Sequence, residues 1–324
     1  MSSFRKINYS LRPAKSVERK MLSFALKKLS HFESLSNYQY IGFGATTFHD
    51  FILFHKDLGI NKMISIEVSG NKQRFNFNKP FHCIEMKYGD SQAILPGLDW
   101  SQKAILWLDY DKLINASYLD DITTFFSSAS SGSIFLMTIN CDSELYGETN
   151  EDRREKIIEE IGEGNLHFGN KLIDFSSNNL SKSLHQIIDN RIKSTLISRN
   201  ASLSDVNHFS YEQLFHFHYA DGVKMLTIGG MLVNKEDKEI FNSVNFDEYS
   251  FIKKGEEAFN IDIPILTMKE IRFLNSQLPY GIDDDGNFLV AVPNASNPNL
   301  AQTDIQKYAK IYSFFPLYAE AFSI

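Results

Sequence analysis

Cysteine and positive charge are both scarce in this chain of 324 residues. Its two cysteines, Cys83 and Cys141, lie inside apolar runs, so we expect free thiols in a reducing cytoplasm rather than a disulfide. Lysine and arginine total 33 against 40 acidic residues, which gives a net charge of −7 and argues against duplex nucleic acid as a partner. No run approaches the ~18 apolar residues of a membrane span, and the first residues lack a signal-peptide core. These absences favour a cytoplasmic globular protein.

Apolar runs and helical spacing alternate through the first half of the chain. The runs predict buried strands at 38–43, 62–68, 81–86, 104–108 and 133–139. Helical spacing predicts helices at 16–32, 47–58 and 118–127, the second opened by a capping box of Thr47 and Asp50. Alternation at this pace indicates βαβ units and a parallel sheet. Asp221-Gly222, between two β-like runs at 214–219 and 224–233, indicates an antiparallel hairpin.

These patterns predict an α/β chain with a Rossmann-like, doubly wound sheet. The sheet should be mostly parallel, with an antiparallel hairpin near its C-terminal end, a helical insert and a C-terminal extension. We expect three parts, namely an N-terminal arm and helix at 1–34, a Rossmann-like domain at 35–234 with a helical insert at about 143–211, and an α-rich extension at 235–324 packed on the core.

Glycines and carboxylates stand at the ends of four predicted strands. They are Gly42-Phe43-Gly44, Glu67, Gly89-Asp90 and Asp109-Tyr110-Asp111. Open α/β sheets bind ligands outside the carboxyl ends of their strands. Glycine lets the backbone approach a ligand, and an acid about 20 residues further on suits ribose hydroxyls. Any one of these segments could be a simple turn or helix cap, but four in order favour a nucleotide-like pocket.

These segments resemble class I S-adenosylmethionine-dependent methyltransferases, and look most like the small-molecule and bacterial O-methyltransferases. The matching residues are 40–45, 66–67, 89–95 and 105–111, and the resemblance covers roughly 35–234. It implies S-adenosylmethionine as cofactor, with the glycines near its methionine part, Glu67 on the ribose, Asp90 on the adenine and Asp109 near the methyl group. The residues implied to bind it are Gly42, Phe43, Gly44, Glu67, Gly89, Asp90, Ser91 and Asp109. The chain departs from the family where an acid usually precedes the first glycine, which here is Tyr40, and at the third glycine position, which here is Thr46.

Methyl transfer from a sulfonium depends mainly on alignment of the reacting atoms, and a base is needed only if the acceptor must lose a proton. Asp109 is the candidate base and Tyr110 a candidate substrate contact. Arg12 and Lys15 belong to a polar segment ahead of the first helix, which either holds an anionic substrate or is a solvated arm.

No metal site is expected. Asp109, Asn140 and Asp142 could gather around Mg²⁺ at neighbouring strand ends, but the asparagine and the second aspartate are better explained as the end of a strand. His216 and His218 share one face of a predicted strand, where packing is the preferred explanation over metal binding.

Two functions follow from different classes. The first is methyl transfer to a small molecule or a partner protein. The alternative is a catalytically degenerate, methyltransferase-like scaffold subunit of a multi-protein bacterial system, which Tyr40 and Thr46 favour. In either case the aromatic tail at 304–322 could join a homo-oligomer or a hetero-complex.

Overall fold

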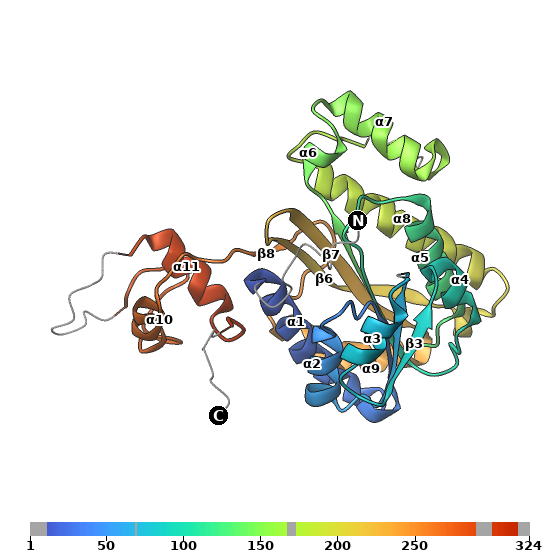
Figure 1. Cartoon of the computed structure of the whole chain (residues 1–324), viewed down its shortest axis with the longest axis horizontal. Helices are drawn as coiled ribbons and strands as arrows, with labels where there is room; N and C mark the ends of the chain where they lie inside the picture. The colour runs from blue at the N-terminus through green and yellow to red at the C-terminus, as the bar shows by residue number, and fades with distance from the viewer. Residues whose placement is uncertain (1–11, 69, 167–172, 290–299, 317–324) are drawn as a thin grey trace.

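A computed structural model of the protein describes residues 12–68, 70–166, 173–289 and 300–316 (Figure 1). Within these ranges the strands form one sheet in the order β3-β2-β1-β4-β5-β7-β6-β8. Strands β1 to β5 are parallel, β7 is antiparallel to both β5 and β6, and β8 is parallel to β6. The strands are β1 (Gln39–Gly42), β2 (Lys62–Glu67), β3 (Ile84–Tyr88), β4 (Ala104–Asp109), β5 (Ser133–Asn140), β6 (Ser210–Ala220), β7 (Lys224–Val233) and β8 (Phe259–Ile261).

The predicted fold class is therefore confirmed, a doubly wound sheet with an antiparallel hairpin. The strand order reverses between β1 and β4, and ligands of such sheets bind at this switch point. Asp221 and Gly222 form the turn between β6 and β7, as predicted.

Helices cover both faces of the sheet, as Figure 1 shows. Alternate residues of β4 divide between two hydrophobic clusters, with Ile105 and Trp107 on one face and Leu106 and Leu108 on the other. The first face packs against α1, α2 and α9, and the second against α5, α7 and α8. The helices are α1 (Pro13–Leu26), α2 (His49–Leu58), α3 (Lys72–Asn78), α4 (Ser91–Ile94), α5 (Ala116–Ser128), α6 (Ser143–Tyr146), α7 (Asn150–Ile161), α8 (Leu180–Asn200), α9 (Lys235–Val244), α10 (Met268–Asn275) and α11 (Gln302–Ile311).

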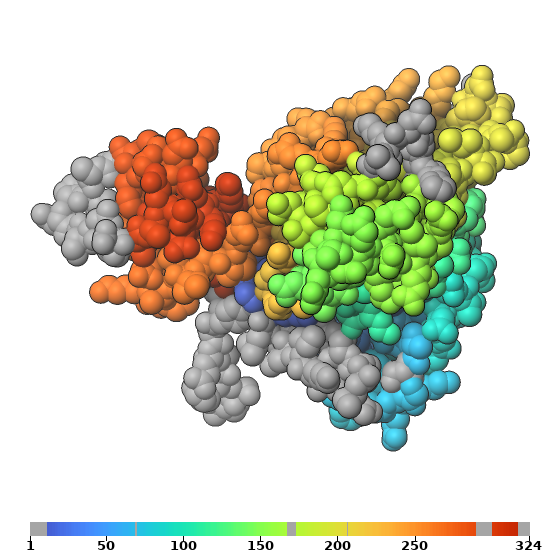
Figure 2. Space-filling view, turned by 90° about the horizontal axis from the view of Figure 1, so that it is seen from above, coloured from blue at the N-terminus to red at the C-terminus, as the bar shows by residue number. Residues whose placement is uncertain are grey.

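Helices α6 and α7 stand at the carboxyl edge of the sheet, because they directly follow the end of β5. Figure 2 looks onto this edge and shows α7, in bright green, near the centre of the view. Thr149 and Asp152 form a capping box that opens α7. Three apolar side chains, Ile157, Ile161 and Leu166, anchor this charged segment to the core.

The C-terminal segment contains an element that the sequence patterns did not reveal. Strand β8 pairs with β6 and extends the sheet, whereas the sequence patterns predict no strand in the α-rich extension after residue 234. Helices α10 and α11 lie together to the left of the sheet in Figure 1 and share a small cluster of their own around Leu274 and Tyr308. Tyr308 of the aromatic tail is therefore buried, while the rings of Tyr318 and Phe322 lie outside the described residues.

Both cysteines are unpaired, Cys141 buried and Cys83 half-buried, as expected. In the part of the chain that the structure describes, no helix has the length and apolar character needed to cross a bilayer.

Candidate active site

The four predicted segments meet at the carboxyl edge of neighbouring strands. Glu67 lies opposite Tyr88 at the ends of β2 and β3. Gly42 pairs with both Ser65 and Trp107, which places the end of β1 between β2 and β4. The topology thus arranges Asp90, Glu67, the glycine turn and Asp109 in that order along one edge.

The turn after β1 is shaped by the protein's own packing. A Cβ atom on Gly44 would lie 2.4 Å from the Phe48 ring, and one on Gly42 would lie 2.6 Å from the hydroxyl oxygen of Tyr40. Both positions therefore require glycine even without a ligand. Ala45 and Phe48 adopt left-handed backbone conformations, with φ of 49° and 50°.

The predicted capping box of Thr47 and Asp50 is wrong. Helix α2 begins at His49, and its N-cap residue is Phe48, which makes no side-chain cap. Phe48 is fully buried, so core packing of its ring, rather than capping, sets the start of the helix. The Asp50 carboxylate instead accepts a hydrogen bond from the Tyr40 hydroxyl. The buried acid Asp50 thus contacts Tyr40, the residue that stands where the family usually has an acid.

Glu67 is directed toward this turn. Its Oε1 accepts hydrogen bonds from the Ala45 N–H at 2.7 Å and from the Ser65 hydroxyl at 3.4 Å. The residue is only 9% exposed. Burial raises the pKa of Glu67 to about 7, although the hydrogen bond from Ala45 opposes the rise. In its ionised form, a carboxylate at this position can accept hydrogen bonds from ligand hydroxyl groups.

The end of β3 presents Asp90 to solvent. Asp90 is exposed and is the N-cap residue of α4, but its side chain makes no cap. The Gly89 N–H donates to the Glu67 carbonyl at 3.1 Å, which joins the two strand ends. The Ser91 hydroxyl turns inward and donates to the buried Asp121 carboxylate at 2.5 Å. Asp90, rather than the Ser91 side chain, is thus available to a ligand here.

Aromatic rings line the edge between β1 and β4. The Tyr110 ring stacks on Tyr118, with centroids 3.5 Å apart, and its centroid lies 5.2 Å from that of Phe43. The Tyr110 hydroxyl donates to Asp121. Tyr110, predicted as a substrate contact, therefore offers a ring rather than a free hydroxyl.

Lys15 does not belong to a polar arm, as the sequence suggested, but to α1. Its side chain is 1% exposed, and its ammonium nitrogen lies 2.9 Å from Asp109 Oδ1, 2.7 Å from Glu18 Oε2 and 3.0 Å from the Tyr219 hydroxyl. It also lies 4.5 Å from the centre of the Trp107 ring. The solvated-arm hypothesis is thus wrong for Lys15. Arg12, half-buried, is the N-cap residue of the same helix.

The β6–β7 hairpin holds the start of α1. Both oxygens of Asp221 accept backbone hydrogen bonds, Oδ1 from Ala14 at 3.1 Å and Oδ2 from Lys15 at 2.9 Å. The first N–H groups of a helix have no partner within it, and Arg12 supplies no side-chain cap. Asp221 therefore caps α1 from 206 residues away and fixes Lys15 beside Asp109.

Glu18 is the site residue that the sequence reasoning missed. It is fully buried, and its Oε1 accepts a hydrogen bond from Thr227, which contacts Thr138 on β5. Burial raises the pKa of Glu18, and Lys15 opposes the rise. The available signal was the position of Glu18 on the apolar stripe of the helix predicted at 16–32, where charges are uncommon.

His185, His216 and His218 lie on the face of the sheet opposite α1. The rings of His185 and His216 stack with centroids 4.7 Å apart, and His218 packs edge-on against His216. Burial lowers the pKa of His216 to about 3 and that of His218 to about 4. Across the described ranges, no group of three histidine, cysteine or acidic side chains is placed to hold a metal ion.

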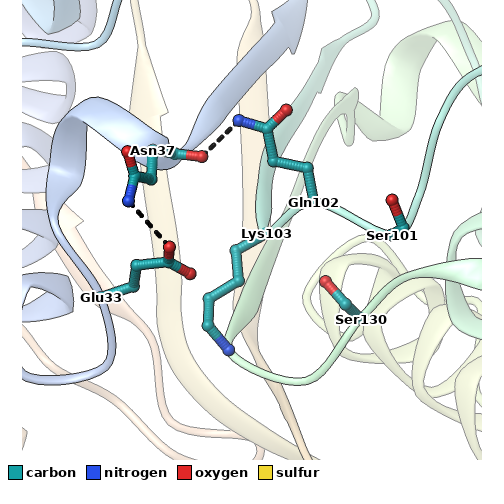
Figure 3. A pocket seen from close by; sticks show the side chains of 6 residues that line it. All are labelled: Glu33, Asn37, Ser101, Gln102, Lys103 and Ser130. Atoms are coloured by element: carbon teal, nitrogen blue, oxygen red, sulfur yellow. Dashed lines mark hydrogen bonds between the residues drawn. The ribbon is translucent and has the colours of Figure 1, made fainter.

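A shallow hollow of about 410 Å³ lies away from this edge. Figure 3 shows its lining, in which Asn37 donates to Glu33 and Gln102 donates to the Asn37 carbonyl. These residues precede β1 and β4 and so stand at the amino ends of the strands. Sheets of this type bind ligands at the opposite ends, so we assign the hollow no part in the site.

Strand order and carboxyl-edge residues together define a class I methyltransferase fold. A family model described as "Putative O-methyltransferase" matches residues 7–323. The chain belongs to this O-methyltransferase family.

Several solved structures are similar to part of the chain. Trm1 from Pyrococcus horikoshii, in complex with S-adenosyl-L-methionine, is 12% identical with a TM-score of 0.45, covering 70% of this chain and 57% of that protein. Human N-acetylserotonin methyltransferase with the same ligand is 12% identical with a TM-score of 0.33, covering 67% and 55%. TYW2 from M. jannaschii with the same ligand is 12% identical with a TM-score of 0.38, covering 71% and 80%. The chain thus spans less than two thirds of the first two proteins, and no curated protein matches it.

Proposed function

We propose that the protein transfers a methyl group from S-adenosylmethionine to an oxygen atom of a small molecule or a partner protein. The observation that carries this proposal is the placement of Glu67. Its buried carboxylate lies 2.7 Å from the Ala45 N–H, between the glycine turn of β1 and the end of β3. Membership of the O-methyltransferase family supports the reaction class.

The donor set at this edge fits the cofactor. Glu67 would accept hydrogen bonds from the two ribose hydroxyls, and the exposed Asp90 would accept one from the adenine amine. The rings of Phe43 and Tyr110 offer flat apolar surfaces beside the base. Asp109 supplies a negative charge at the end of β4, which suits a cationic sulfonium.

When bound, S-adenosylmethionine supplies an electrophilic methyl group. The residues of the chain then have two tasks, which are to align an acceptor oxygen and to remove its proton. Asp109 is the proposed base, because its Oδ1 is held by Lys15 while 30% of its side chain is exposed. The ion pair with Lys15 fixes one oxygen of this carboxylate beside the proposed cofactor site.

The acceptor is proposed to enter beside α6 and α7, which stand at the carboxyl end of β5. Arg12 is the N-cap residue of α1, the helix that carries Lys15, and remains a candidate contact for an anionic acceptor. A net charge of −7 makes duplex nucleic acid a poor acceptor.

Isothermal titration of S-adenosylmethionine tests the proposal. We expect wild type to bind and Glu67→Ala to bind at least tenfold more weakly, since hydrogen bonds to charged groups contribute about 1.5–3 kcal/mol. Glu85→Ala is the matched control, because Glu85 is an exposed glutamate on the neighbouring strand β3. Equal binding by wild type and Glu67→Ala would refute the assigned site.

The alternative function is a methyltransferase-like scaffold without turnover. The observation that favours it is the replacement of the usual acid by Tyr40, whose hydroxyl is bound to Asp50 within the core. Absence of binding by a folded wild-type protein would support this alternative over the enzyme.

A further inference from the structure

Lys15 has no spare hydrogen-bond donor. An ammonium group carries three N–H donors. Here each donor has an oxygen acceptor, which belongs to Asp109 at 2.9 Å, Glu18 at 2.7 Å or Tyr219 at 3.0 Å. The side chain is 1% exposed. Lys15 can therefore hold an anionic substrate only by giving up one of these partners, and its present contacts assign it to the protein's own carboxylates.

Stability does not explain these buried charges. Removing a lysine and a glutamate from water costs several kcal/mol for each ion, and apolar side chains of similar volume often stabilise such a site equally well. Lys15 and Glu18 lie among the apolar residues Val17, Met21 and Leu22 of α1, where apolar side chains would pack against the sheet. The charges therefore have another role.

That role concerns Asp109, which is partly exposed, whereas its neighbours Lys15 and Glu18 are buried. Lys15 fixes Asp109 Oδ1, whereas no described residue hydrogen-bonds to Oδ2. The Asp109 side chain remains 30% exposed at the switch-point edge. Glu18 holds Lys15 from the opposite side, and the Thr227–Thr138–Trp107 chain of hydrogen bonds fixes Glu18 to the sheet.

We propose that Lys15 is a positioning residue, which fixes Asp109 Oδ1 and so directs the other carboxylate oxygen toward the methionine and sulfonium end of the bound cofactor. Glu18 acts one step further away, by fixing Lys15. This inference rests on the proposed function and adds helix α1, which lies outside the strand-end motifs, to the cofactor site.

A paired substitution separates positioning from structural support. Lys15→Met combined with Glu18→Gln removes one positive and one negative charge, so the net charge near the cofactor is unchanged. The two fully buried ions are removed together, and Asp109, which loses Lys15, is 30% exposed. We expect this double variant to melt within a few degrees of wild type. We also expect it to bind S-adenosylmethionine about tenfold or more weakly in isothermal titration. Lys27→Met is the matched control, because Lys27 is exposed just beyond α1.

A thermodynamic cycle shows whether Lys15 acts through Asp109. Asp109→Asn should weaken binding by a similar factor, and adding the double substitution to Asp109→Asn should weaken it no further, since coupled residues are not additive. Wild-type affinity in the folded double variant, wild-type affinity in Asp109→Asn, or additive losses would each overturn the inference. These outcomes differ from failure of the proposed function, in which wild type itself does not bind or Glu67→Ala binds as wild type does.

Discussion

Glu67→Gln should make the ligand-free protein more stable at alkaline pH while weakening cofactor binding. Burial raises the pKa of Glu67 from an ordinary value of 4.5 to about 7. At about 1.4 kcal/mol for each pH unit, this difference corresponds to about 3 kcal/mol of destabilisation once the carboxylate is ionised in the folded protein. Glutamine retains a carbonyl oxygen for the Ala45 N–H but carries no charge.

The direction follows from proton binding. Because the folded pKa lies above the unfolded value, the folded state holds the Glu67 proton more tightly between pH 4.5 and 7. Stability therefore falls as pH rises through this window and stays low above it. The glutamine variant lacks this loss, so it should match wild type near pH 4.5 and exceed it by about 2–3 kcal/mol at pH 8.

Urea unfolding at pH 4.5, 6 and 8 measures the effect, with the midpoint and slope giving the free energy of unfolding at each pH. Glu85→Gln is the control, since that glutamate is exposed. An advantage of Glu67→Gln that does not depend on pH, or a variant less stable than wild type at pH 8, would refute the burial argument.

The same carboxylate should release protons when the proposed cofactor binds. Ribose hydroxyls that donate to Glu67 favour its ionised form and lower its pKa, so binding near pH 7 should expel a fraction of a proton per site. Titrations at pH 7 in buffers of different ionisation enthalpy would show this, and Glu67→Gln should abolish it. Proton release that persists in the variant would assign the titration to another group.

Three further predictions concern the scaffold of the site. Asp221→Ala removes the cap of α1 and should lower the free energy of unfolding by about 1–2 kcal/mol; an unchanged urea midpoint would show that the carboxylate does not hold the helix. Gly44→Ala places a methyl group 2.4 Å from the Phe48 ring, so we expect a loss of about 1–3 kcal/mol by thermal unfolding, and wild-type stability would mean that the turn adjusts freely. His216, whose pKa is lowered to about 3 mainly by burial, is stabilising as the neutral ring above pH 6.5, and this stability is lost as pH falls below that value. His216→Gln should therefore flatten the decline in urea midpoint between pH 6.5 and 4.5, and an identical decline would contradict the assignment.

Strands and turns were the most predictable part of this protein. The runs that became β2, β4 and β5 are predicted to within one residue at each end, because buried parallel strands need continuous apolar sequence. The turn at Asp221-Gly222 is also local, since its geometry depends on the three residues 221–223 between β6 and β7. The capping box at Thr47 failed, because burial of Phe48 moved the start of α2 by two residues.

Strand β8 was missed for a related reason. It has only three residues and its pairing partner β6 lies about 40 positions earlier, so no local pattern distinguishes it from loop. The prediction for Lys15 was wrong because a lysine near proline and arginine is typical of a solvated segment. Its partners Asp109 and Tyr219 are remote in sequence.

The sequence by itself determined the order of strands and helices and the residues at the strand ends, among them Glu67, Asp90 and Asp109. These features depend on neighbours within a few positions, where apolar periodicity and glycine geometry act. Only the tertiary structure decided which charges meet, since a buried ion becomes favourable only beside an opposite charge. The chain brings Lys15 to Asp109 across 94 positions, and that contact joins the N-terminal helix to the candidate active site.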